Sequence, residues 1–240
     1  MIRQVHTRCF VLLLFLSIGV IQAQKIIYCF PGQGSDARIF DSLIIDPSYK
    51  LKIIDYGMPE KGMTMKAFAL QLSEQIDTTQ GFLLLGVSLG GMICTELSEI
   101  LNPEKTIIIS SAKNINELPV RYKFQKAIPL YKLFSGRALL TGAKILQPIV
   151  EPDRKKNKAT FIKMLGSKKP EYMKRSINLL INWDKETNQS KIYQIHGTLD
   201  HTLPIRNIAS PDVVINAGSH MMTLTRASEV SIALNGILTQ

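Results

Sequence analysis

Cysteine and histidine are scarce in this sequence, with three and four residues among 240. None of them stands at the spacing of a zinc motif, which argues against a metal site. Cys29 falls on a predicted strand and Cys94 in a predicted helix, and an oxidising compartment would permit them to pair. Two cysteines outside a loop-rich framework are more often buried apolar side chains, so the sequence leaves their pairing open.

Acidic residues are absent from the sequence before Asp36, and no apolar run is long enough to span a membrane. The run at residues 9–21 falls short of the roughly 20 residues that a spanning helix needs. Arg3 and Arg8 precede this apolar run, and the small residue Ala23 follows it. This order is typical of a secretory signal peptide, so we predict that residues 1–23 are cleaved and that the mature protein is exported to the periplasm or the medium. An uncleaved anchor is the alternative.

Internal repeats and low-complexity tracts are also absent, and the chain is long enough to bury one good core. Apolar runs of strand type alternate with amphipathic helical patterns, which is typical of an α/β protein with a mainly parallel sheet. The predicted helices cover residues 65–76, 92–101 and 225–238. The six predicted strands cover residues 25–30, 51–56, 81–85, 105–109, 191–195 and 213–215.

Positive charge is concentrated in residues 113–186, which hold 17 Lys and Arg against 6 Asp and Glu in a chain of net charge +10. Prolines interrupt helical patterns there and no strand pattern persists, so we predict a helical insertion between core segments 24–112 and 187–240. A basic patch can attract anionic surfaces or an acidic substrate, or it can be a solvated helical face. Nucleic acid is not expected as a partner, because aromatic residues are not interleaved with the basic ones.

A serine flanked by glycines stands between a predicted strand and a predicted helix, in the sequence Gly-Val-Ser-Leu-Gly of residues 86–90. A strand that turns directly into a helix crowds the backbone, and glycines relieve the crowding because they lack a Cβ. The hydroxyl of Ser88 is then expected to be exposed at the apex of the turn, as in a nucleophile elbow. The alternative is a glycine-rich turn in which the serine only caps the helix.

An acid and a histidine follow Ser88 in the chain, Asp200 and His220, each in a loop after a predicted strand. Loops after parallel strands open at the same edge of a sheet, so the three side chains are expected to meet there. The chemistry needs all three, because a serine hydroxyl is a poor nucleophile until an imidazole removes its proton. The imidazole in turn needs a carboxylate that fixes its tautomer and stabilises its charged form.

Other assignments of these loops stay open. Asp200 could be an ordinary turn aspartate, with His196 as the working histidine and His201 as a surface neighbour. His196 precedes the acid and is expected at the end of its strand, where it can brace the loop instead. The glycine-rich loop at residues 31–36 can direct the backbone N–H of Gln33 toward a developing oxyanion, or it can be a simple turn.

The three motifs together resemble those of the α/β-hydrolase fold superfamily over essentially the whole mature chain. The resemblance rests on residues 86–91, on His-Gly-Thr-Leu-Asp at 196–200 with Pro204 beyond it, and on Gly-Ser-His-Met-Met at 218–222. It implies an α/β fold with a mainly parallel six-stranded sheet flanked by helices and a helical lid inserted at 113–186. The first two strands of the fuller family sheet are absent from this sequence.

The resemblance also implies roles for individual residues: Ser88 as nucleophile, Asp200 as acid and His220 as base. The backbone N–H groups of Leu89 and Gln33 would form the oxyanion hole. One departure concerns this loop, because the family's usual His-Gly before it reads Pro-Gly here. No metal and no cofactor are implied.

We therefore predict an exported serine hydrolase that cleaves a small-molecule ester, as a carboxylesterase does, through an acyl-enzyme. An acyltransferase or a thioesterase would use the same triad, and a non-catalytic binding protein on a hydrolase fold is the third reading. The substrate, the chain-length preference and the oligomeric state are left open. Apolar residues of the insertion could line an acyl pocket or form the core of the lid itself: Phe134, Leu139, Leu140, Phe161, Leu179, Leu180 and Trp183.

Overall fold

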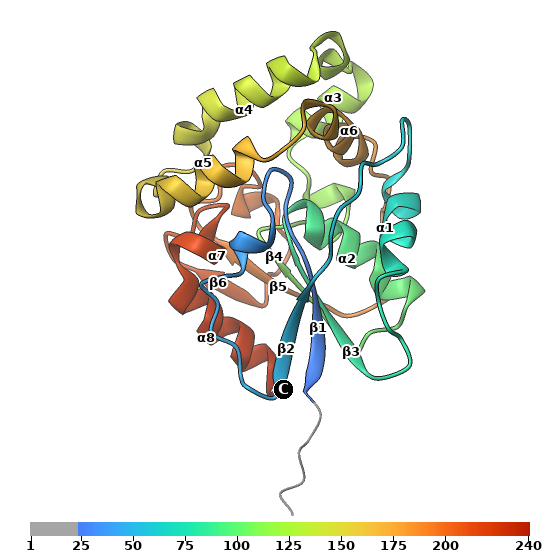
Figure 1. Ribbon diagram of the computed structural model, residues 1–240, viewed down its shortest axis with the longest axis vertical. Helices are drawn as coiled ribbons and strands as arrows, with labels where there is room; N and C mark the ends of the chain where they lie inside the picture. Colours follow the sequence, from blue (N-terminus) through green and yellow to red (C-terminus); the bar gives the residue numbers. More distant parts are fainter. Residues whose placement is uncertain (1–23) are drawn as a thin grey trace, which may run out of the picture.

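The computed structural model describes residues 24–240, so the predicted signal peptide lies outside the described residues. Its centre is one sheet with helices on both faces (Figure 1). All neighbouring strands pair in parallel, in the order β2-β1-β3-β4-β5-β6, which confirms the predicted six-stranded sheet. The strands are β1 (Lys25–Phe30), β2 (Tyr49–Ile53), β3 (Phe82–Val87), β4 (Lys105–Ile109), β5 (Ile192–Gly197) and β6 (Val213–Ile215).

The central strands are apolar on both sides because helices cover both faces of the sheet. Along β1, Tyr28 packs into one apolar cluster and its neighbour Ile27 into the other, as the alternation of side chains along a strand requires. The helices α1 (Met65–Ser73) and α2 (Leu89–Ile100) supply the first cluster, and α8 (Ala227–Leu238) supplies the second. The core therefore lies in two layers around β1, β3 and β4.

Residues 113–186 form a helical segment between β4 and β5, and Figure 1 shows its helices above one edge of the sheet. Near its end, Trp183 is 1% exposed and donates a hydrogen bond of 2.7 Å from Nε1 to Oε1 of Glu96 on α2. The segment is thus packed into the same apolar core as the sheet. Its helices are α3 (Val120–Ala127), α4 (Gly136–Val150), α5 (Lys158–Gly166) and α6 (Pro170–Ile181).

Most of the apolar residues that could have lined a pocket are core residues. Leu179, Leu180 and Trp183 pack with α1 and α2, whereas Phe161 joins the cluster on the other face of the sheet. Phe134 is 53% exposed. Burial of these side chains stabilises the attachment of the helical segment to the core.

Some element boundaries differ from the sequence prediction. Strand β2 begins two residues earlier than expected, and α2 begins directly after Ser88, because Gly90 and Gly91 are helical despite their low helix propensity. The predicted helix 225–238 begins two residues later, as α8, and a separate short helix α7 (Met222–Thr225) precedes it, with a non-helical backbone at Arg226 (φ −134°, ψ 39°) between them.

Cys29 and Cys94 are both free and buried, so the described residues contain no disulfide between them. Burial raises the pKa of both thiols above the ordinary value, which keeps them protonated and unreactive. Within residues 24–240, no helix combines the length and the apolar character that crossing a membrane requires.

Candidate active site

Ser88 occupies a sharp turn between β3 and α2. Its backbone has φ 53° and ψ −119°, a region that side chains seldom adopt. The flanking glycines are required by close backbone approach: a Cβ on Gly86 would overlap the carbonyl of Gly90, and one on Gly90 would overlap the carbonyl of Phe30. The N–H of Ser88 donates to the carbonyl of Ile109 at 3.0 Å, which ties the turn to the end of β4.

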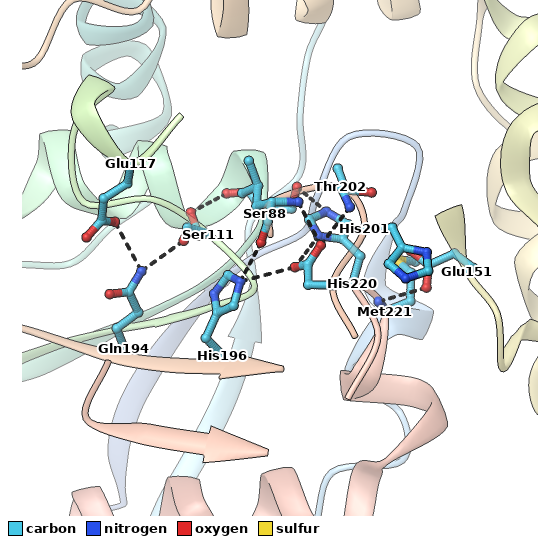
Figure 2. A network of polar contacts seen from close by, with 12 residues as sticks. Ser88, Ser111, Glu117, Glu151, Gln194, His196, His201, Thr202, His220 and Met221 are labelled. Carbon is cyan, nitrogen blue, oxygen red and sulfur yellow. Dashed lines mark hydrogen bonds and ion pairs between the residues drawn. The ribbon is translucent and has the colours of Figure 1, made fainter. Parts of the chain in front are cut away.

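The three predicted site residues meet at the carboxyl edge of the sheet, where Figure 2 shows Ser88 and His220. Oγ of Ser88 lies 2.8 Å from Nε2 of His220, and Nδ1 of His220 lies 2.8 Å from Oδ2 of Asp200. The serine follows β3, the aspartate follows β5 and the histidine follows β6. Parallel strands bring residues that are 132 and 20 positions apart in the chain into one hydrogen-bonded line.

The carboxylate of Asp200 is fixed by its own loop. Its Oδ1 accepts backbone N–H groups of Thr202 at 2.8 Å and Leu203 at 2.7 Å, which leaves Oδ2 facing His220. Burial alone would raise the pKa of Asp200, but the charge of His220 and these hydrogen bonds outweigh it and the pKa is lowered. Asp200 is therefore ionised in the folded protein at neutral pH.

The pairing with Asp200 also changes the pKa of His220. Burial alone would lower the pKa of His220, whereas the charge and hydrogen bond of Asp200 raise it above its usual value. An imidazole held in this way can accept a proton from Ser88 and keep the resulting charge close to a carboxylate.

The two other histidines of the described chain take different positions. His196 is fully buried at the end of β5, with Nε2 2.7 Å from the carbonyl oxygen of Leu203 and 3.4 Å from Oδ2 of Asp200. His196 therefore supports the loop that carries Asp200. Burial lowers the pKa of His196. Exposed His201 contacts the carbonyl of Ile149 at 3.1 Å.

The loop proposed for the oxyanion hole passes directly beside Ser88. A Cβ on Gly32 would lie 3.2 Å from Cβ of Ser88, so only glycine permits this approach without displacement of a neighbour. The next residue is Gln33, whose Nε2 donates to Oγ of Ser176 on α6 at 2.8 Å. Leu89 is the first residue of α2, as a donor at a helix N-terminus should be.

The hydroxyl of Ser88 was expected at an exposed apex, and in the structure the residue as a whole is largely enclosed. Ser88 keeps 9% of its surface exposed and His220 keeps 7%, so both side chains are buried. The loop at Gly32 lies against the serine, and the end of α4 reaches the turn that follows His220. The sequence pattern describes only the strand and helix around the serine, and these do not reveal what covers it.

Sequence reasoning also missed a second carboxyl group beside the histidine. Glu151, directly after α4, is 4% exposed, and its Oε2 accepts the backbone N–H of Met221 at 3.2 Å. Burial raises its pKa to about 7, although the charge of His220 opposes this effect. No signal in the sequence could have found it, because it lies in the helical segment and not at the end of a strand.

Residues 24–240 contain no group of three or more His, Cys, Asp or Glu side chains that could hold a metal ion. The polar groups at the site instead form an uninterrupted chain from hydroxyl to imidazole to carboxylate. Such a chain can remove a proton from the serine during attack and return it to a leaving group.

No family model and no curated protein matches this sequence. Solved structures do match its fold. A thermophilic esterase from Thermogutta terrifontis superposes with a TM-score of 0.70 at 14% identity, covering 90% of each chain. The esterase EaEST from Exiguobacterium antarcticum gives 0.67 at 16% identity, over 92% of this chain and 94% of that one. The enol-lactonase from Burkholderia xenovorans LB400 gives 0.66 at 14% identity, over 90% and 92%.

Proposed function

We propose that this chain, which has the α/β-hydrolase fold, is a serine hydrolase that cleaves a carboxylic ester through Ser88, His220 and Asp200. One observation carries the proposal: the line of two 2.8 Å contacts from Oγ of Ser88 through the imidazole to Oδ2 of Asp200. Neighbours described as esterases and a lactonase support acyl chemistry, but their low identity leaves the substrate open.

In the proposed cycle, Nε2 of His220 takes the proton of Ser88 as Oγ attacks the ester carbonyl carbon. The N–H groups of Leu89 and Gln33 would donate to the oxyanion of the tetrahedral intermediate. Collapse breaks the bond to the alcohol oxygen, which leaves with the proton from His220, and an acyl-serine remains. Water then attacks the acyl-serine after giving a proton to His220, and the acid is released while Ser88 regains its proton.

The test is the hydrolysis of acyl esters of increasing chain length by the purified protein, together with covalent labelling by a fluorophosphonate. An acyltransferase would divert the acyl group to an added alcohol or amine, and a thioesterase would prefer acyl thioesters. A binding protein would bind an ester without turning it over or taking up the label. Product analysis separates these outcomes in one set of assays.

Export is the second part of the proposal and rests on the amino-acid sequence, because residues 1–23 lie outside the described structure. Arg3 and Arg8, the apolar residues 9–21 and Ala23 are the signal that supports it. We expect the intact mass of the protein from the periplasm or the medium to correspond to a chain that begins at or near Gln24. A cell-associated protein that retains residues 1–23 would contradict export with cleavage.

We further propose that the outer surface of helical segment 113–186 is attracted to anionic lipid. Besides its surplus of basic residues, ten of the seventeen large apolar side chains exposed in the described structure belong to this segment. On α4, Ile145 and Ile149 are four residues apart and thus share one exposed face, with Lys144 exposed next to Ile145. Exposed apolar residues among basic ones fit a negatively charged membrane surface, whereas two like-charged segments would repel each other in a dimer.

Replacing exposed Lys155, Lys156 and Lys158 by glutamine is expected to weaken binding to phosphatidylglycerol vesicles. At about 1 kcal/mol per basic residue near an anionic surface, the three replacements together cost about 3 kcal/mol, a loss at low salt of roughly 100-fold. The difference from the parent protein should shrink as salt rises, because the screening length is about 8 Å at physiological ionic strength. Vesicle co-sedimentation across a salt series measures both effects.

The matched control replaces three exposed lysines outside the helical segment, Lys50, Lys61 and Lys66, and so changes the net charge equally. This control should bind vesicles nearly as the parent does. Equal binding by both triple variants would mean that the lysines of the segment are only solvated and do not attract anionic lipid.

A further inference from the structure

The end of helix α4 is held by both loops that carry the proposed acid and base. The carbonyl of Ile149, in the last turn of α4, contacts Nδ1 of His201 in the acid loop at 3.1 Å. Two residues later, Oε2 of Glu151 accepts the N–H of Met221, the neighbour of His220, at 3.2 Å. Figure 2 shows Glu151 beside Met221 at this turn. Helical segment 113–186 is therefore tied directly to the catalytic loops.

Glu151 differs from the exposed carboxylates of the segment because it is 4% exposed. Burying a carboxyl group is costly unless hydrogen bonds or an opposite charge compensate for the lost water. Its compensation in this structure comes from the Met221 N–H and from the nearby imidazole of His220. A buried carboxyl group held next to His220 points to an electrostatic role at the histidine.

Four titratable or charged side chains surround His220, two from β5 and the loop after it and two from the helical segment. Asp200, after β5, acts at Nδ1, and His196 on β5 lies behind the acid. The helical segment contributes two opposed side chains: Glu151 from α4 favours the charged imidazole, and Arg121 from α3 disfavours it. Arg121 is also bound to the acid loop, through the carbonyl oxygens of His201 and Thr202.

We propose that Glu151 is a positioning residue through which helical segment 113–186 controls the protonation of His220. When the end of α4 rests on the turn after His220, the second carboxylate stabilises the imidazolium that forms as Ser88 loses its proton. When that contact opens, His220 keeps Asp200 as its one acidic partner and becomes a weaker base. The inference rests on the proposed function, because a proton-accepting role for His220 is what gives the control its purpose.

The experiment compares Glu151→Gln with the parent protein by two independent readouts. The amide oxygen of glutamine can still accept the Met221 N–H, so the variant removes the charge and retains the contact. NMR titration of the histidine rings should show a lower pKa for His220, by about half a unit or more, against the roughly 1 to 3 units of a directly contacting charge. The acid limb of kcat/KM should move to lower pH as well, because the neutral imidazole is the active form. Its shape should also become simpler, because Glu151, with a pKa of about 7, no longer titrates beside His220.

Two comparison variants test the assignment. Glu171→Gln removes an exposed carboxylate of the same segment, paired with Arg175, and should leave the His220 titration unchanged. Arg121→Gln removes the opposing charge and should raise the pKa of His220. An unchanged titration in folded Glu151→Gln would overturn the proposal, since a purely structural latch would not depend on charge.

The two readouts also separate this inference from the proposed function. A shifted His220 titration in a protein that hydrolyses no ester would uphold the electrostatic coupling and overturn ester hydrolysis. If Glu151→Gln does not fold, Glu151→Asp withdraws the charge by one methylene group and should lower the pKa of His220 less. No shift in that variant either would overturn the coupling.

Discussion

Replacing Ser88 by alanine is expected to abolish ester hydrolysis and covalent labelling by a fluorophosphonate, with the fold retained. The change deletes one oxygen, whose contact is Nε2 of His220 at 2.8 Å. Without that oxygen no acyl-enzyme can form, and the expected loss in kcat is on the order of 10⁶ if subtilisin is a fair precedent. Circular dichroism and thermal unfolding should be close to those of the parent, since the strained backbone at residue 88 is maintained by Gly86 and Gly90 and not by the hydroxyl.

Ser98→Ala is the matched control for this experiment. Ser98 lies on α2, the helix that begins directly after Ser88, and is 2% exposed, but its hydroxyl donates to the carbonyl of Thr95. Its loss should cost about 1 kcal/mol of stability and leave turnover intact. If folded Ser88→Ala still hydrolysed esters at the parental rate, the proposed function would be wrong, and a binding role would become the better reading.

Much of the fold could be predicted because its strands have a simple physical signature. Strands covered by helices on both faces need short continuous apolar runs, and β1 and β4 begin and end where these runs do. Strand β2 begins two residues and ends three residues before its predicted bounds because it is an edge strand, in which exposed Lys50 and Lys52 alternate with partly buried residues. An alternating edge strand has no apolar boundary that marks its ends.

The serine, acid and histidine were predictable for a related reason, since each follows a strand and strand ends mark the site in a parallel sheet. The position of Glu151 beside His220 and the burial of Ser88 could not be predicted from the sequence. Both depend on how helical segment 113–186 folds back over the sheet, and that arrangement is set by contacts between residues far apart in the chain, such as Glu151 with Met221. Local periodicity contains no information on such contacts, and a buried glutamate has the same sequence pattern as an exposed one.

Asp200→Asn is expected to reduce kcat by about 10⁴, the precedent set by serine proteases, with substrate binding little changed. The hydrogen bonds of this structure explain why. Oδ1 of Asp200 accepts the N–H groups of Thr202 and Leu203, so the amide oxygen of asparagine must take that position. The NH₂ group is then directed at Nδ1 of His220, where a donor now meets the atom that normally donates.

This arrangement favours the imidazole tautomer with its proton on Nε2. That nitrogen lies 2.8 Å from Oγ of Ser88 and can no longer accept the serine proton, so the nucleophile is not activated. Proton NMR should show loss of the downfield Nδ1–H signal, and pre-steady-state kinetics should show slow acylation. A fall in kcat of less than tenfold would contradict this role for Asp200. The remaining acid beside His220 is Glu151, and the double variant Asp200→Asn with Glu151→Gln would then reveal whether it had taken over the charge.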